Sequence, residues 1–131
     1  MRRSRAAAAV FVLLLACNEE KATTKPSPKP SASTPVALSP PEEAKQLVTN
    51  RCSMCHGASG HGDGPTAATL NPKPRDFSSR EWQKSISDGQ IRTVILQGGV
   101  GVGKSALMPP NQDLADKPAV VEELVRIVRS Y

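Results

Sequence analysis

The stretch RCSMCHG at residues 51–57 places Cys52 and Cys55 three positions apart and puts His56 directly after the second cysteine. The pattern Cys-x-x-Cys-His is typical of covalent haem attachment, because each thiol can add to one vinyl group while the next imidazole coordinates the iron. A redox dithiol and half of a zinc site are the alternatives. A redox dithiol normally comes with a βαβ pattern, which is missing here, and zinc would need two further ligands, of which only His61 is near. We therefore favour one covalently bound haem.

The rest of the chain favours helices over a continuous sheet. Ser39 and Glu42 form a capping-box pattern with proline in the first turn, and Ser87 and Gln90 repeat the pattern. Residues 57–78 are rich in Gly, Pro, Asn and Asp and predict a long loop, which needs a rigid scaffold. The expected helical segments are 40–51, a short turn from 79, 88–97 with Gly98 as its stop, and a C-terminal helix from about 118. The predicted fold class is all-α.

The first forty residues predict a signal peptide followed by a lipid-anchored linker. Met1–Ala16 has the basic start and short apolar run of a signal peptide. Cys17 ends a Leu-Leu-Ala-Cys sequence that resembles the lipobox of bacterial lipoproteins, so we expect a lipid anchor at Cys17; an ordinary signal peptide with a chance cysteine is the alternative. Residues 17–39 read as an extended Pro/Ser/Lys/Thr-rich linker, or else as a polyproline ligand, and residues 40–131 as the domain. We expect an extracytoplasmic protein, in the periplasm or on the outer surface, held to a membrane.

The composition argues against nucleic-acid binding and indicates that a non-protein group completes the core. The formal charge is +5, but three of the 17 basic residues lie at positions 2, 3 and 5. Without them 14 basic residues face 12 acidic ones, with no block of like charge to follow phosphates, so we expect no nucleic-acid binding. Two Phe, one Trp and one Tyr provide little flat apolar surface. A large flat macrocycle would serve as the centre of such a core.

From Pro40 onward the chain resembles the class I cytochrome c family, particularly its small bacterial single-haem carriers. The likeness rests on CSMCHG at 52–57, HGDGP at 61–65, MPPN at 108–111 and a terminal helix. It implies a class I cytochrome c fold, with about three to four short helices wrapped round one haem c. The chain departs from the family where the first and last helices cross, since Ala44, Val48 and Ile127 stand where glycine and aromatic residues are usual.

The resemblance also implies roles for single residues. Met108, which is 52 residues after His56 on a Pro-rich loop, matches the family's methionine ligand of the iron, with a buried loop methionine as the alternative. The carbonyl of Pro65 is expected to accept the Nδ1 proton of His56, and the Asn111 amide to hydrogen-bond the Met108 sulfur. His61 is expected to be a solvent-facing or structural imidazole, and ligation of the iron is its alternative role.

Residues 98–105 also match the P-loop pattern Gly-x-x-x-x-Gly-Lys-Ser. A P-loop must open a helix whose N-terminus holds the phosphates. Met108-Pro109-Pro110 follows within one turn and prevents a helix of useful length. We therefore expect no nucleotide binding despite this match.

Ligation by both His56 and Met108 would leave the iron no open position for a substrate. The expected function is therefore one-electron, outer-sphere transfer between transient redox protein partners, a donor and an acceptor, and not an enzymatic reaction. Met ligation and burial would both favour the ferrous state. The alternatives are a haem sensor, or a fixed haem subunit of a larger respiratory or dehydrogenase complex.

Overall fold

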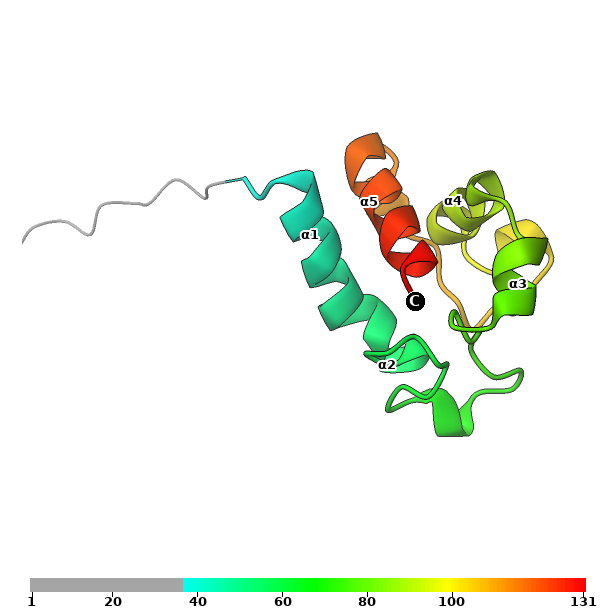
Figure 1. Ribbon diagram of the computed structural model, residues 1–131. Coiled ribbons are helices and arrows are strands. Elements are labelled where there is room, and N and C mark those ends of the chain that lie inside the picture. The colour runs from blue at the N-terminus through cyan, green and yellow to red at the C-terminus, as the bar shows by residue number, and fades with distance from the viewer. Residues whose placement is uncertain (1–36) are drawn as a thin grey trace, which may run out of the picture. The chain divides into compact units, whose positions relative to one another are not determined.

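The computed structural model describes residues 37–131, which form helices joined by loops without any strand (Figure 1). The α-helices are α1 (Pro40–Leu47), α2 (Ser53–His56), α3 (Arg80–Ser85), α4 (Asp88–Gln97) and α5 (Pro118–Arg129). The other helical segments are the π-helix η1 (Val48–Cys52) and the 3-10 turns η2 (Ala67–Thr69), η3 (Val100–Val102) and η4 (Gln112–Leu114). The all-α prediction is confirmed. The predicted signal peptide, Cys17 and almost all of the predicted linker lie outside the described residues.

The first helical run is longer than predicted. It begins as expected at Pro40, where the backbone N–H of Ser39 donates to the Glu42 carboxylate at 3.1 Å and completes the capping box. The predicted end at Arg51 is wrong, because α1, η1 and α2 follow one another without a break to His56. No helix breaker occurs before Gly57, whose φ of 77° turns the chain away. The Cys-x-x-Cys-His motif is therefore part of a helix and ends it.

The three later α-helices lie where their local signals predict them. The Ser79 side chain accepts a hydrogen bond from the Trp82 amide at the start of α3. Ser87 and Gln90 form the second capping box, and α4 has the predicted bounds, with Gly98 following its last residue. Pro118 occupies the first turn of α5. Each of these signals acts within three or four residues, which is why the sequence pattern was sufficient to predict where these helices begin.

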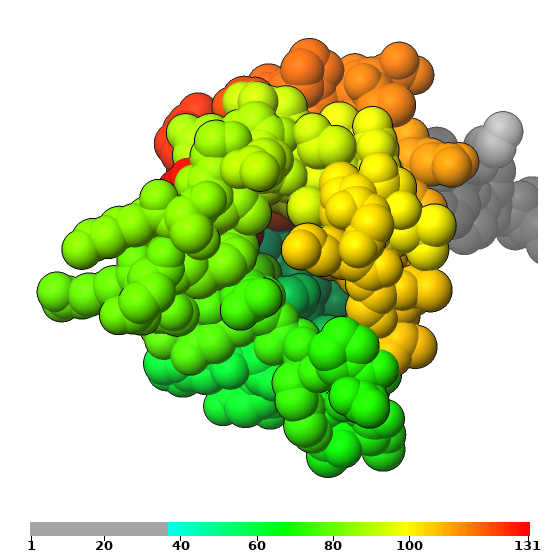
Figure 2. All heavy atoms as spheres, turned by 90° about the vertical axis from the view of Figure 1, so that its right-hand side faces the viewer, coloured from blue at the N-terminus to red at the C-terminus, as the bar shows by residue number. Residues whose placement is uncertain are grey.

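Two long loops complete the domain and frame a hollow face. Residues 57–79 and residues 98–111 border this hollow, and the first helical run forms part of its floor (Figure 2). The P-loop-like stretch 98–105 forms η3 and a turn at Gly103, and the next α-helix begins only at Pro118. Within residues 37–131, no helix combines the length and the apolar character needed to cross a membrane.

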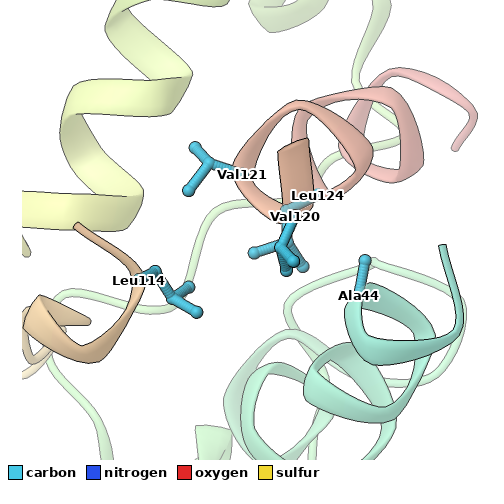
Figure 3. Packing of buried hydrophobic residues seen from close by; sticks show 5 residues of the cluster. All are labelled: Ala44, Leu114, Val120, Val121 and Leu124. Carbon is cyan, nitrogen blue, oxygen red and sulfur yellow. The ribbon is translucent and has the colours of Figure 1, made fainter. Parts of the chain in front are cut away.

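The core lies where α1 packs against α5. Ala44 of α1 has no exposed surface, and Val120 and Leu124 of α5 point towards it (Figure 3). Val48 and Ile127 are partly buried against the same cluster. The crossing is thus made of aliphatic side chains, as its sequence predicts, and its tightness depends on the small Ala44.

Candidate functional site

An apolar cavity lies between the first helical run, α5 and the loop that carries Met108. Its walls include Cys52, His56, Phe77, Met108 and Leu124. The enclosed volume is about 60 Å³. It brings together residues from both ends of the domain, and it is lined by apolar side chains with few polar groups, as cofactor sites commonly are.

His56 is held in one orientation by two contacts. Its Nδ1 lies 3.0 Å from the carbonyl oxygen of Arg75, so Nδ1 carries the proton and donates it. The Phe77 ring stacks on the imidazole with the centroids 4.3 Å apart and the planes 16° from parallel. Burial lowers the pKa of His56, although the Arg75 carbonyl opposes the shift. The imidazole is therefore neutral at pH 7, with the lone pair on Nε2, which is the form that ligates metals.

The acceptor for Nδ1 differs from the predicted one. We predicted the carbonyl of Pro65, and the structure shows that of Arg75. The loop folds back along the helix that precedes it, since Gly64 N donates to Cys55 O at 3.1 Å and Thr66 N donates to Met54 O at 3.0 Å, which places Pro65 beside the motif helix. A second proline-rich run, PKPRDF at 72–77, lies further along the same loop. This run is the sequence signal that could have pointed to Arg75 and Phe77.

The two cysteines of the motif have free, half-buried thiols. Cys52 lines the cavity, and its burial raises the pKa of the thiol. Cys55 does not line the cavity, and its sulfur lies 3.3 Å from the hydroxyl oxygen of Thr66. The structure thus places Cys52 and His56 at the cavity and Cys55 one helical turn away towards the 57–79 loop.

Met108 lines the same cavity as His56, although 52 residues separate them in the sequence. Its side chain is half-buried, and its carbonyl accepts a hydrogen bond of 2.9 Å from Gly99 N. The predicted bond from Asn111 to the Met108 sulfur is not formed, and the Asn111 amide nitrogen donates instead to the Ile95 carbonyl at 2.7 Å. Ile95 lies in the last turn of α4, where carbonyls lack partners within the helix and need an outside donor.

Comparison with known families agrees with this arrangement. The family model described as cytochrome c matches residues 41–122. The chain belongs to the cytochrome c family. A search of curated proteins found no match for the chain.

Cytochromes c carry covalently attached haem c, and a domain of this size suits a single haem. The residues of this cytochrome c fit that group. They provide a cysteine pair, an imidazole with no hydrogen bond to Nε2 from the described part of the chain, a thioether and an apolar lining. A haem is larger than the enclosed 60 Å³, so it would extend into the hollow face of Figure 2.

His61 lies away from the cavity of this cytochrome c. Its Nδ1 is 3.0 Å from the Ser78 hydroxyl and 3.6 Å from the Asp76 carboxylate, and its side chain is about half exposed. His61 thus links two parts of the 57–79 loop, which confirms the expected structural role. Within the described residues no group of three or more His, Cys, Asp or Glu side chains is placed to hold a metal ion.

Proposed function

We propose that this cytochrome c is a single-haem electron carrier in which Cys52 and Cys55 form the thioether bonds and His56 and Met108 ligate the iron. The observation that carries the proposal is that His56 and Met108 line one apolar cavity. When bound, the haem supplies one-electron exchange between ferric and ferrous iron. If His56 and Met108 both held the iron, no position would be left for a substrate.

The protein's own residues set the conditions for that exchange. The Arg75 carbonyl holds the proton of His56 on Nδ1 and so keeps Nε2 free. The apolar lining excludes water and disfavours the more highly charged ferric state. A thioether ligand such as Met108 acts in the same direction, because it is a weaker donor than a second imidazole. Both effects raise the reduction potential.

We further propose an extracytoplasmic location, with Cys17 acylated and residues 17–39 acting as a tether. This proposal is supported by the signal-peptide pattern at 1–16 and by the cysteine that ends it. The partners would be redox proteins that dock transiently, as a carrier requires. Replacing Cys17 by serine should move the haem-containing protein from the membrane fraction to the soluble fraction. Retention in the membrane fraction would refute the lipid anchor.

The first test of the site is an absorption spectrum of the mature protein in both oxidation states. We expect c-type bands and the weak near-infrared band of Met-ligated ferric haem, with little response of the ferrous form to carbon monoxide. Met108→Leu should remove the near-infrared band and allow carbon monoxide to bind. Met54→Leu is the matched control, because Met54 is exposed within the motif and should leave both properties unchanged.

The outcomes separate the proposed function from its rivals. Absence of haem would refute the proposed function and would favour a redox dithiol formed by Cys52 and Cys55. A c-type spectrum without the near-infrared band, together with carbon monoxide binding by the unaltered protein, would favour a haem sensor. If Met54→Leu lost the near-infrared band and Met108→Leu kept it, the assignment of Met108 as the iron ligand would be wrong.

A further inference from the structure

Arg51, the residue before the first cysteine of the motif, contacts the loop that carries Met108. Its guanidinium nitrogens lie 3.0 and 3.1 Å from the two carboxylate oxygens of Asp113, and one of them also lies 2.8 Å from Asn111 Oδ1. This is a bidentate, charge-assisted arrangement, which is the geometry in which such pairs are strongest. The guanidinium lowers the pKa of the Asp113 carboxyl. Neither the sequence motifs nor the family assignment gives Arg51 a role.

These contacts attach the Met108 segment to the motif helix, in addition to the bonds of Asn111 to Ile95 that attach it to α4. On one side Gly99 N donates to the Met108 carbonyl at 2.9 Å, which ties the segment to the end of α4. On the other side Asn111 and Asp113 are tied to Arg51, and Arg51 itself lines the cavity with Met108. Arg51 is therefore the only side chain of the motif helix, within the described residues, that forms a hydrogen bond to the 98–114 segment.

The position of Arg51 makes this link specific to the iron ligands. Arg51 precedes Cys52 directly and lies five residues before His56, so it is fixed to the element that holds one side of the cofactor. Asn111 follows Met108 by three residues. A bond between Arg51 and this loop thus couples the position of the histidine to that of the methionine. Leu114, which follows Asp113, is part of the α1–α5 core, so the far end of the loop is also fixed by packing.

We propose that Arg51 is a positioning residue that keeps the Met108 loop closed over the cavity and so protects the sulfur ligand from displacement. The inference rests on the proposed function, because it requires Met108 to ligate the iron. Both side chains are about half exposed, at 45% for Arg51 and 55% for Asp113, so the ion pair contributes modestly. Its loss should raise the fraction of molecules with an open loop by about two- to fivefold.

The test measures how readily free imidazole displaces Met108 in the ferric, haem-loaded protein, followed by loss of the near-infrared band. Arg51→Gln and Asp113→Asn should each bind imidazole about two- to fivefold more tightly than the unaltered protein. The double variant should not exceed Arg51→Gln, because that substitution already removes the contacts to both Asn111 and Asp113. High salt should tighten imidazole binding in the unaltered protein and have little effect in the variants.

Arg92→Gln is the matched control. It breaks the ion pair between Arg92 and Glu122, which is also bidentate and similarly exposed but joins α4 to α5. We expect its imidazole affinity to stay unchanged. Equal tightening in Arg92→Gln, or no tightening in Arg51→Gln and Asp113→Asn, would overturn the proposal. If Arg51→Gln does not load haem, Asp113→Asn carries the test, since it leaves the motif intact.

The spectrum of the unaltered protein distinguishes failure of the Met108 assignment from failure of the proposed role of Arg51. If it lacks the near-infrared band, the assignment of Met108 is wrong and the role of Arg51 falls with it. If it shows the band and the variants behave like the unaltered protein, the proposed function stands and only the role of Arg51 is refuted.

Discussion

Replacement of Gly62 by alanine tests how tightly the 57–79 loop is built around His56. Gly62 has a φ of 73°, and an added Cβ would lie 2.4 Å from the carbonyl oxygen of Pro74. The positive φ costs an alanine about 1 kcal/mol. The overlap forces the Pro74 carbonyl to move, which adds about 2 kcal/mol by comparison with overpacked cores. We therefore expect Gly62→Ala to lower the free energy of unfolding by about 3 kcal/mol.

Gly103→Ala is the matched control for this prediction. Gly103 also has a positive φ, of 67°, but no other atom lies within 4 Å of its added Cβ. It should lose only the backbone contribution, about 1 kcal/mol. The measurement is denaturant unfolding of both haem-loaded proteins by circular dichroism. Equal losses in the two variants would refute the prediction, because the overlap with the Pro74 carbonyl would then cost nothing.

The same substitution should also alter the electronic properties of the site. Pro74 precedes Arg75, whose carbonyl accepts the Nδ1 proton of His56. Displacing this peptide weakens that hydrogen bond and makes the imidazole a poorer donor to ferric iron. The reduction potential of Gly62→Ala should therefore rise, while that of Gly103→Ala should not change. A stability loss without a change in potential would show that the Arg75 carbonyl follows His56 independently of the loop.

Three further predictions concern contacts at and beyond the site. Phe77→Leu removes the ring stacked on His56 and should lower the free energy of unfolding by about 1–2 kcal/mol, measured by denaturant titration. Asp76 accepts bonds from the backbone N–H and hydroxyl of Ser78, which lower its pKa below the ordinary 3.8. Its stabilising contribution is full above about pH 3.8 and disappears as pH falls through the lowered pKa. Asp76→Asn should therefore be less stable than the unaltered protein at pH 6, by a difference that shrinks as the pH of the unfolding measurement is lowered. Ala44→Leu should separate α1 from α5 and cost about 1–3 kcal/mol in thermal or denaturant unfolding, because Ala44 is completely buried.

The parts of the fold that could be predicted from the sequence are those with short-range causes. The capping box at Ser87 and Gln90 and the stop at Gly98 gave the exact bounds of α4, because each signal concerns groups only a few residues apart. The gathering of His56 and Met108 at one cavity was expected from the family resemblance and could not be obtained from periodicity. The extension of the first helix to His56 was not predicted, although no helix breaker occurs between Arg51 and Gly57 and the sequence would have allowed it.

The two wrong assignments, Pro65 and Asn111, both concern hydrogen bonds between distant parts of the chain. The bond from His56 to Arg75 spans 19 residues and depends on the path of a loop that lacks any repeating pattern. The bond from Asn111 to Ile95 depends on the end of α4 lying beside the Met108 loop. Neither path is encoded in local spacing, so the residue types that could form a bond were visible in the sequence while the actual partners were not.

The bonds of Asn111 also change what that residue does for the candidate ligand. Both its backbone N–H and its amide nitrogen donate to the Ile95 carbonyl, at 3.3 and 2.7 Å, and its Oδ1 accepts from Arg51. A carbonyl at the end of a helix needs a donor more than a thioether does, because sulfur is a weak acceptor. Asn111 therefore acts on Met108 through the backbone of the loop and not through a bond to the sulfur. It follows that Asn111 and Arg51 act on how firmly Met108 is held, while the Arg75 carbonyl acts on the donor strength of His56.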